Sequence, residues 1–344
     1  MNKNKLKAIL KNFSGQKILV IGDMVADEYI FGMTSRISRE APVIILKYTS
    51  QAVLPGCGAN AINNINTLGG DVFPLGVVGD DEMGRGLINT LKKKGINTEG
   101  IISDKTRLTP TKTRILAGGY NTTKQQVIRI DRENNDTISR KTEERLLKIF
   151  METVDIADTI LVSDYGLGTL SEGILNSINK LAKKGEKIIT VDSRFDILKY
   201  CYVTAATPNT EEVEWALNVA LNENNIKHHG QKILKQIKSN GLLITRGKEG
   251  MTLFEKNGDI TEIDIYGTDE VADVTGAGDT VISTFTLALA AKASMKEAAR
   301  LANYAGGIVV MKSGTATVTT EEIENAIDSE AKASHYNHDT FAEA

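Results

Sequence analysis

Cysteine is scarce in this chain of 344 residues, which has two cysteines, and long apolar stretches are missing. Cys57 and Cys201 follow no metal-ligand spacing and are too few for a disulfide framework, so a reducing compartment is expected. No segment reaches the ~18 apolar residues of a membrane span, and residues 1–13 lack the apolar core of a secretion signal. These absences predict a cytoplasmic protein without a membrane partner.

An excess of charge of one sign is also missing. The chain carries 41 basic and 44 acidic residues, and its formal net charge is −3. Without a strong positive excess there is no reason to expect nucleic acid or an anionic membrane as a partner. Basic groups that bind a phosphorylated ligand must therefore be local, and the expected ligands are small molecules.

Two standard phosphate-binding fingerprints are not found either. The spacing from Gly241 to Gly247-Lys248 is one residue too long for a P-loop, and Glu249 follows the lysine, so that motif is excluded. The segment Gly22-Asp-Met-Val-Ala, which follows the first apolar run, lacks the glycine pattern of dinucleotide-binding oxidoreductases. That class of enzyme is excluded as well.

The chain does have a glycine-containing turn that runs directly into an apolar helix, over residues 273–286. Glycines in the turn let the backbone approach a ligand closely. Unpaired N–H groups and the positive end of the helix dipole can then bind the charge of a transferred phosphoryl group. The candidate anion hole consists of Gly276, Ala277 and Gly278. Asp279 lies beside it as a candidate general base.

A structural interpretation of this turn is also open, in which Asp273 or Thr275 caps the helix and Asp279 only favours its N-terminus. However, the segment from Asp273 to Asp279 resembles the C-terminal signature of the ribokinase-like (PfkB) sugar kinases. In that family Gly-Ala-Gly-Asp supplies the anion hole and the catalytic aspartate. At Thr284, where the family usually has alanine or glycine, this chain departs slightly from the pattern.

Strands and helices alternate over much of the chain, which predicts an α/β fold with a doubly wound, mostly parallel sheet flanked by helices. The length allows either two domains or one large α/β domain. Expected strands of this sheet include 17–22, 159–163, 187–191 and 242–245, and expected helices include 140–153, 171–184, 210–221 and 228–239. The resemblance identifies this arrangement as a ribokinase-like fold.

Three β-rich runs at 43–48, 111–115 and 126–131 have no helices between them, which predicts a small separate sheet. An extension of the main sheet is the alternative. In the resembling family such a sheet is a lid over the sugar and often pairs between subunits, which implies a homodimer. The expected division is a kinase domain over 1–328, with lid strands inserted at about 29–50 and 110–132, and a polar tail over 329–344.

Polar residues that could bind the sugar follow the first strand and open an early helix. Asp23 and Asp27 come at the carboxyl end of the strand, where open α/β sheets bind ligands; both could instead be solvated turn residues. The resemblance implies that Asp27 holds the acceptor sugar. It also assigns a sugar-binding turn to Gly56, Gly58 and Asn60.

Asn64 lies one helical turn after Asn60, so the two amides share one face of the helix. Buried asparagines are costly unless they are paired, which favours a ligand. We therefore expect Asn64 to contribute to the sugar site as well.

Asn209 and Glu212 have the spacing Asn-x-x-Glu, which suits either water held around Mg²⁺ or a helix cap. The resemblance places them, with Thr210 and Glu211, beside the nucleotide phosphates, and Glu212 would bind Mg²⁺ through water. The other implied nucleotide-binding residues are Thr245, Gly247, Gly250 and Asn303. The implied cofactors are ATP and Mg²⁺, and a monovalent cation near the anion hole is left open.

A narrower resemblance, to the heptose 7-phosphate kinases, covers nearly the whole chain. It implies ATP-dependent phosphorylation of O1 of D-glycero-β-D-manno-heptose 7-phosphate, on the way to ADP-heptose for lipopolysaccharide. Such kinases are often fused to a nucleotidyltransferase domain, for which this sequence is expected to be too short. The motifs that carry the resemblance are 34–43, 125–131, 162–166, 206–209, 301–303 and 314–318.

A phosphorylated acceptor needs basic groups, because arginine binds phosphate strongly in a bidentate manner. The candidates are Arg36, Arg39, Lys112, Arg114 and Arg129, and we expect Arg36 and Arg129 to be among the true contacts.

Two departures bear on the substrate. Leu167 and Ser193-Arg194 stand where the heptose kinases usually have Lys and Pro-Lys, and Arg194 is a possible substitute for a missing cation. Two alternatives follow. One is a PfkB kinase for another sugar, of fructose or nucleoside type, and the other is a catalytically silent sugar or nucleotide sensor.

Overall fold

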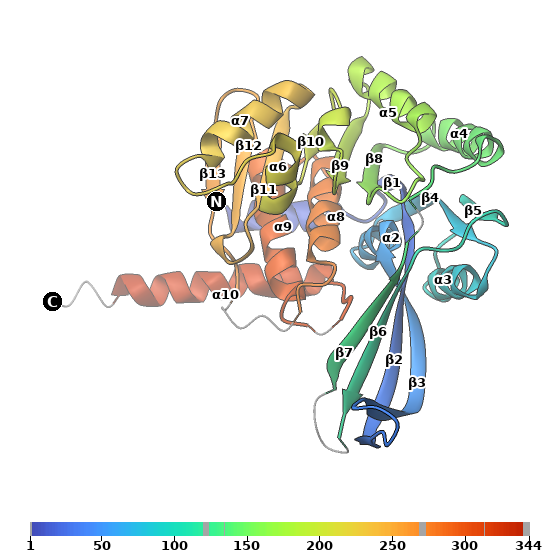
Figure 1. The fold of residues 1–344 in the computed structure, drawn as a ribbon. Helices are drawn as coiled ribbons and strands as arrows, with labels where there is room; N and C mark the ends of the chain where they lie inside the picture. The colour runs from blue at the N-terminus through green and yellow to red at the C-terminus, as the bar shows by residue number, and fades with distance from the viewer. Residues whose placement is uncertain (1, 120–123, 134, 268–272, 313, 340–344) are drawn as a thin grey trace.

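The computed structural model describes residues 2–119, 124–133, 135–267, 273–312 and 314–339. The described part of the chain is built on a nine-stranded sheet (Figure 1). Its strands follow the order β13 (Ile260–Ile263), β12 (Met251–Glu255), β11 (Gly241–Thr245), β10 (Ala205–Ala206), β9 (Ile188–Ser193), β8 (Thr159–Asp164), β1 (Lys17–Gly22), β4 (Asp71–Gly79) and β5 (Ile101–Asp104). Neighbouring strands are parallel except for the antiparallel pairs that join β11, β12 and β13.

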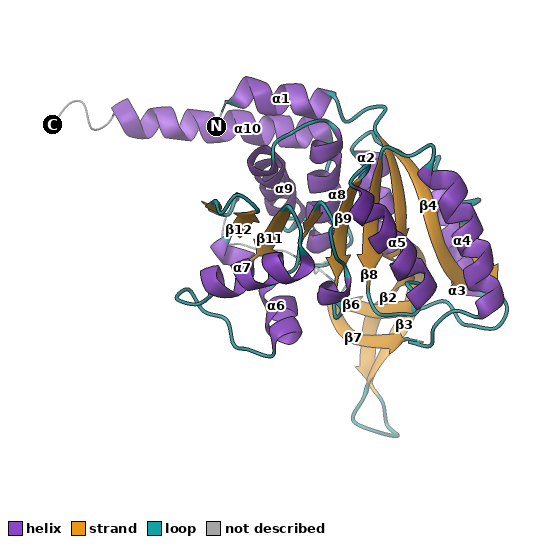
Figure 2. Ribbon diagram, turned by 90° about the horizontal axis from the view of Figure 1, so that it is seen from above, coloured by secondary structure: helices purple, strands orange, loops and turns teal. Residues whose placement is uncertain are grey.

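Helices cover both faces of this sheet (Figure 2). Along β1 the apolar side chains alternate: Ile18 and Val20 enter one core, whereas Leu19 and Ile21 enter the other. The first core is shared with α1 (Lys3–Lys11), α2 (Gly58–Thr67), α3 (Glu82–Lys93), α8 (Ala277–Ala290), α9 (Met295–Val309) and α10 (Thr320–Asp339). The second is shared with α4 (Arg140–Val154), α5 (Glu172–Lys184), α6 (Thr210–Leu217) and α7 (Ile226–Ile237). The predicted doubly wound fold is confirmed.

A second sheet of four described strands projects from the main body (Figure 1). Its order is β3 (Ile44–Cys57), β2 (Met24–Ile37), β6 (Thr111–Gly118) and β7 (Gln125–Arg132). β2 pairs with β3 antiparallel and with β6 parallel, and β6 pairs with β7 antiparallel. The predicted separate lid sheet is confirmed, and the alternative, an extension of the main sheet, is wrong.

Strand β2 was not predicted. Its first six residues, Met24 to Tyr29, are buried on both faces, so the alternation that marks a half-buried strand is absent there. Only Asp23 separates the end of β1 from the start of β2, so no turn sequence marks the boundary between the two strands. β2 thus connects the main sheet directly to the lid.

The boundary expected after residue 328 lies inside α10, which continues to Asp339. On this helix Glu330 accepts hydrogen bonds from Arg300 and from the Tyr304 hydroxyl of α9. Glu330 therefore ties the part of α10 just beyond residue 328 to α9. None of the described helices is long and apolar enough to cross a membrane.

A substitution at Gly22, the last residue of β1, tests how closely β1 packs against β8. A Cβ at this position would lie 2.2 Å from the carbonyl oxygen of Ser163 in β8. We expect Gly22→Ala to lower the free energy of unfolding by ~2–3 kcal/mol, because the backbone of β8 must shift. Urea denaturation followed by circular dichroism measures this change.

The matched control is Gly86→Ala in α3, where the added Cβ would make only ordinary contacts with Val53 at 3.5 Å. Alanine favours a helix interior over glycine, so this variant should gain roughly 0.5–1 kcal/mol. Equal effects of the two substitutions would contradict the packing assigned to Gly22.

Candidate active site

The candidate active site lies where the carboxyl ends of β1, β8 and β9 meet the base of the lid and the start of α8. Three aspartates mark these strand ends: Asp23 follows β1, Asp164 ends β8 and Asp192 lies near the end of β9. Open parallel sheets bind their ligands at this edge. Asp164 and Asp192 were not predicted, although a carboxylate at the carboxyl end of a parallel strand was an available signal.

Helix α8 begins at the predicted glycine turn. Its N-cap residue is Gly276, with φ 78° and ψ 8°, and a Cβ there would lie 2.6 Å from Nδ2 of Asn60. No side chain in the described chain caps this helix, so the interpretation of Asp273 or Thr275 as the cap is wrong. Asp273 accepts instead from the backbone N–H groups of Thr275, at 2.9 Å, and Gly314, at 3.0 Å.

The three predicted anion-hole amides are not equivalent. The N–H of Ala277 donates to the carbonyl of Val274 at 3.2 Å. Within the described residues, the N–H groups of Gly276 and Gly278 have no such backbone acceptor. These two amides at the positive end of the helix dipole are the better candidates for binding an anion.

Asp279 lies in the first turn of α8 and is buried. One carboxylate oxygen accepts from Nδ2 of Asn60 at 2.9 Å, and the other accepts from the hydroxyl of Tyr165 at 2.9 Å. Burial raises the pKa of Asp279 to about 7, although these two hydrogen bonds lower it. A carboxylate with such a pKa is suited to accept a proton at neutral pH. Tyr165 was not predicted as a site residue.

Asn60 and Asn64 form a chain of hydrogen bonds that ends on Asp279. Asn64 Nδ2 donates to the side-chain oxygen of Asn60 at 3.3 Å and to its backbone oxygen at 2.9 Å. The hydroxyl of Thr280 donates to the side-chain oxygen of Asn64 at 3.0 Å. The two amides therefore help to orient the candidate base, and the sugar contact expected of them stays a prediction.

Asp23 is also engaged by the protein. Its buried carboxylate accepts from the backbone N–H groups of Tyr165, Leu167 and Thr169, at 2.9 to 3.1 Å. Burial raises the pKa of Asp23, and the charge of Asp164 adds to that shift. Asp23 thus anchors the loop that carries Tyr165, and its contact with the sugar stays a prediction.

Asp27, on β2, forms a buried ion pair with Arg114 at 2.8 Å. Burial raises the pKa of Asp27, and the nearby charges of Arg114, Lys112 and Arg129 lower it. Arg129 itself makes two hydrogen bonds with Asp131, at 2.6 and 2.7 Å. Three of the five predicted basic residues therefore gather at the base of the lid, around the aspartate predicted to hold the sugar.

The sugar-binding turn packs closely on the two early aspartates. A Cβ at Gly56 would lie 2.9 Å from the carboxylate of Asp27, and a Cβ at Gly58 would lie 2.9 Å from the backbone oxygen of Asp23. Glycine is needed at both positions for close packing within the protein.

Arg36 and Arg39 do not share this position. Arg36 lies nine positions after Asp27 on β2, a separation of roughly 30 Å at ~3.3 Å per residue. Arg39 lies still further along the chain. The structure therefore contradicts the expectation that Arg36 contacts the same sugar as Asp27 within one chain, because the sequence motif does not reveal how far the strand extends.

On the other side of Asp279, Asn209 caps α6 and forms a capping box with Glu212. Burial raises the pKa of Glu212 to about 7, although the backbone N–H of Asn209 and the charge of Arg194 lower it. Burial also raises the pKa of Asp192 well above its usual range, and Glu212 and Asp279 add to that shift. The capping interpretation is confirmed, and the clustered carboxylates could still bind a cation.

The other predicted nucleotide residues lie at the end of β11, in the turn that follows it, and in the middle of α9. Thr245 forms an isolated bridge with Asn209, and the following turn contains Gly247 and Gly250 with φ of 54° and 78°. Asn303, which is buried, donates from Nδ2 to the backbone oxygen of Asp264 at 2.9 Å. Asn303 therefore holds the chain after β13 in place.

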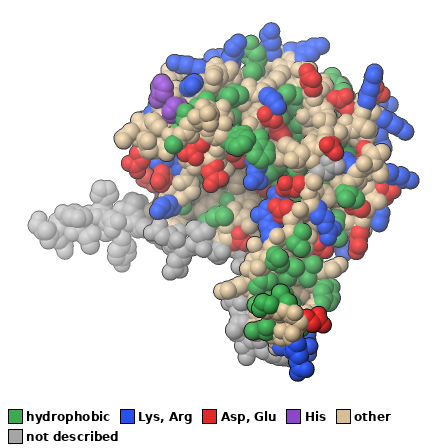
Figure 3. All heavy atoms as spheres, viewed as in Figure 1, with side chains coloured by type: hydrophobic (Ala, Val, Ile, Leu, Met, Phe, Trp, Pro, Cys, Tyr) green, Lys and Arg blue, Asp and Glu red, His purple; other side chains and the backbone are tan. Residues whose placement is uncertain are grey.

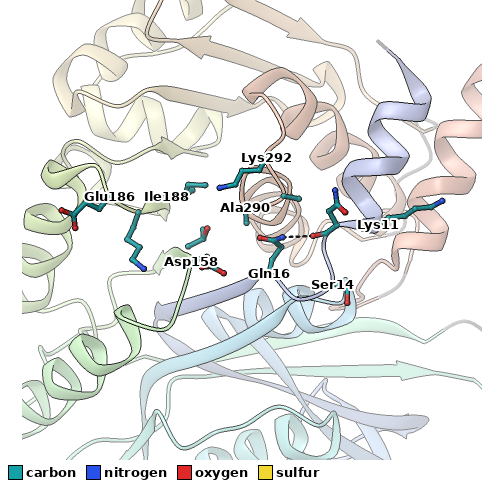
Figure 4. Close-up of a pocket in the computed structure, with 12 residues that line it drawn as sticks. Lys11, Ser14, Gln16, Asp158, Glu186, Ile188, Ala290 and Lys292 are labelled. Carbon is teal, nitrogen blue, oxygen red and sulfur yellow. Dashed lines mark hydrogen bonds between the residues drawn. The ribbon is translucent and has the colours of Figure 1, made fainter.

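A cavity of about 580 Å³ lies at the opposite, amino end of β1, β8 and β9 (Figure 4). Labelled residues such as Lys11, Asp158, Glu186 and Lys292 line it; Lys11 ends α1, and the other three come from loops at that edge. Because it is separated from Asp279 by the length of the sheet, this cavity is not the candidate active site.

The sequence matches the pfkB family carbohydrate kinases over residues 16–322. The chain belongs to this family. It is therefore an ATP-dependent carbohydrate kinase. The resemblance derived from the glycine turn is confirmed, and the excluded oxidoreductase class stays excluded.

Curated relatives include two proteins named bifunctional protein HldE. The protein from Geobacter sulfurreducens is 38% identical over 329 residues, which are 95% of this chain and 66% of the relative. The protein from Helicobacter pylori strain J99 is 39% identical over 310 residues, which are 90% of this chain and 65% of the relative. The chain thus spans about two thirds of the length of these relatives.

Solved structures support the same fold. The structure of Arabidopsis thaliana ribokinase complexed with ribose and ATP has a TM-score of 0.69 at 18% identity and covers 91% of this chain and 99% of that one. Phosphofructokinase-2 from Escherichia coli in complex with potassium has a TM-score of 0.72 at 17% identity, with coverage of 92% and 98%. At these identities the likeness concerns the fold alone.

The ionisation of Asp279 yields a prediction for the kinase. With a pKa of about 7, its carboxylate should make kcat/KM for the sugar rise with pH around neutrality, because only the anion accepts a proton. Asn60→Ala and Tyr165→Phe each remove a hydrogen bond that favours the anion, so the midpoint should move to higher pH. Initial rates across the neutral range measure it.

Tyr200→Phe is the matched control for the loss of a buried hydroxyl, since Tyr200 donates to Asp164 at 2.7 Å. Its midpoint should match that of the unmodified chain. An unchanged midpoint in Asn60→Ala would contradict the assigned role of the amide.

Proposed function

We propose that this kinase phosphorylates O1 of D-glycero-β-D-manno-heptose 7-phosphate in the cytoplasm, as a step of ADP-heptose synthesis. The supporting observation is the placement of a buried, oriented Asp279 beside a cluster of cations at the base of the lid. The motifs that resemble the heptose 7-phosphate kinases extend over nearly the whole chain, and relatives named HldE align with 90% or more of it.

In the proposed reaction Asp279 accepts the proton of the O1 hydroxyl as that oxygen attacks the γ-phosphorus of ATP. The bond from phosphorus to the β,γ-bridging oxygen breaks, and ADP leaves. The N–H groups of Gly276 and Gly278 stabilise the negative charge on the transferring phosphoryl group. Products are the sugar 1,7-bisphosphate, ADP and a proton held at first by Asp279.

Mg²⁺ fits the carboxylates beside this site. Burial of Asp192 and Glu212 near Asp279 leaves negative charge that is only partly compensated, as their raised pKa values indicate. In the described chain no three His, Cys, Asp or Glu side chains are close enough to hold an ion directly. Contacts through water, which Mg²⁺ commonly keeps, suit this arrangement. The bound ion would neutralise charge on the β- and γ-oxygens.

The 7-phosphate of the acceptor would be bound at the base of the lid. Arg114 and Arg129 each have an acidic partner there, Asp27 and Asp131, so a phosphate would compete with these carboxylates for their guanidinium groups. Lys112 is opposite the same two aspartates in the sheet register, but its ammonium lies against Cys57 and Tyr165, so we do not count it among the 7-phosphate contacts. The proposed phosphate contacts include Arg129 but not Arg36 of the same chain.

The first test is ATP turnover against a panel of free sugars and sugar phosphates that includes heptose 7-phosphate. We expect strong selectivity for heptose 7-phosphate, and Asp279→Asn should lower kcat by at least ~10³-fold because it removes the base. ATP binding, measured by calorimetry, should be nearly unchanged in this variant.

The other outcomes separate the alternatives. Preference for another sugar would keep the kinase and reject the heptose assignment. Turnover that persists in Asp279→Asn would reject the assigned base. Binding of sugar and ATP without any turnover would favour the silent sensor.

We also propose that the lid forms a homodimer interface. Hydrophobic side chains gather on the projecting sheet in Figure 3. Exposed apolar residues of the lid region are Ile37, Val43, Ile44, Tyr48, Val127, Ile128 and Ile130. A contiguous apolar surface of this kind is unusual on a monomer and is suited to a second copy of the chain.

The dimer predicts a change of mass in solution. Ile44→Asp combined with Ile128→Asp should convert a dimer to a monomer, because burying the new charges is unfavourable. Light scattering coupled to gel filtration measures the mass. Met151→Asp, an exposed apolar residue on α4, is the control and should leave the dimer intact. A monomeric parent chain would overturn the proposal.

A further inference from the structure

Cys57 has an unusual backbone for a residue with a side chain. It lies at the junction of β3 and α2, between Gly56 and Gly58, with φ 52° and ψ −127°. Residues other than glycine rarely adopt a positive φ, and those that do cluster at functional sites. Cys57 is also buried, against Val25 and Leu167. A side chain at this position, between two glycines, indicates that the thiol has a role of its own.

The thiol sulfur accepts a hydrogen bond from an ammonium group. Nζ of Lys112 lies 3.7 Å from Sγ of Cys57 and 5.5 Å from the ring centroid of Tyr165. Lys112 is only 8% exposed. Its side chain therefore places a largely desolvated cation against a thiol and an aromatic ring.

The register of the lid sheet would favour contacts of the Lys112 ammonium with two aspartates instead. Lys112 on β6 is directly opposite Asp27 on β2 and Asp131 on β7, and directly opposite side chains share one face of a sheet. Yet Lys112 forms no ion pair within 4.0 Å in the described chain. Arg114 pairs with Asp27, and Arg129 pairs with Asp131. The two carboxylates are thus taken by arginines.

The two groups in direct contact with Lys112 are neutral, whereas Asp27, Asp131 and Asp279 act on it from farther away. Burial raises the pKa of the Cys57 thiol well above its usual range, and likewise that of the Tyr165 hydroxyl, so neither group supplies a negative charge. A buried cation with no anion in direct contact attracts one strongly, because little water screens it. The ring under the ammonium belongs to the tyrosine whose hydroxyl donates to Asp279 at 2.9 Å. The cation is therefore next to the proposed base.

We propose that Cys57 is a positioning residue whose thiol holds the Lys112 ammonium beside Tyr165, where it stabilises the phosphoryl group in transit to the acceptor. This proposal rests on the proposed role of Asp279. Leu167, at the position where the heptose kinases usually have lysine, packs against Cys57 and adds no charge there. In the proposal, Lys112 supplies the positive charge beside Tyr165 that Leu167 does not.

The experiment compares kcat and KM of Cys57→Ala, Cys57→Gly and Cys57→Ser on the acceptor that the unmodified kinase prefers. Both Ala and Gly remove the partner of Lys112, so each should lower kcat about tenfold with little change in KM for the acceptor. Ser keeps a polar partner and should stay within about threefold of the unmodified chain. Cys201→Ala, at the other cysteine, is the control and should have no effect.

Alanine and glycine separate this role from a structural one. Glycine relieves the positive φ, whereas alanine retains it, so the two variants should differ in thermal stability while sharing the same loss of kcat. A Cys57→Gly enzyme as fast as the unmodified chain, or a Cys57→Ser enzyme as slow as Cys57→Ala, would overturn the proposal.

A double-mutant cycle gives a second measurement. Lys112→Met should lower kcat more than Cys57→Ala, and adding Cys57→Ala to Lys112→Met should change kcat by less than about twofold. Additive losses would overturn the proposal. Turnover that persists in Asp279→Asn would instead reject Asp279 as the base. That outcome does not depend on the results with the Cys57 variants.

Discussion

The site depends on the buried carboxylate of Asp279, which has no ion-pair partner among the described residues. Asp279 has two hydrogen-bond donors, Asn60 and Tyr165, which come from segments more than 100 residues away in the chain. Neither donor carries a charge, so the carboxylate is oriented while its basicity is preserved. A lysine or arginine in hydrogen-bonding contact would hold the group as firmly but would lower its pKa and weaken it as a base.

The surrounding contacts support this carboxylate indirectly. Asp23 anchors the loop that carries Tyr165, and Asn64 and Thr280 orient the amide of Asn60. Several residues that were predicted as ligand contacts therefore also hold the groups around Asp279 in place. The proposed chemistry is concentrated in a few atoms, and most of the polar groups around them fix the positions of these atoms.

The general fold could be predicted because alternating apolar patterns identify strands and helices locally, and the glycine turn before Asp279 is a local signal too. β2 was missed because burial on both faces of its first half removes the alternation. Tyr165 and the orientation of Asn60 depend on contacts between distant segments, for which one sequence contains no signal. Arg36 was misplaced for a related reason, since a motif shows neighbours in sequence and not the distance that a strand spans.

The lid is joined to the catalytic centre by two continuous pieces of chain. β2 leaves directly from the end of β1, beside Asp23, and β3 runs without a loop into α2, the helix that carries Asn60. No flexible loop separates either lid strand from the element of the site to which it is joined. Any tilt of the lid that accompanies acceptor binding is transmitted to the amide that orients Asp279, so occupancy of the sugar site and readiness of the base are mechanically linked.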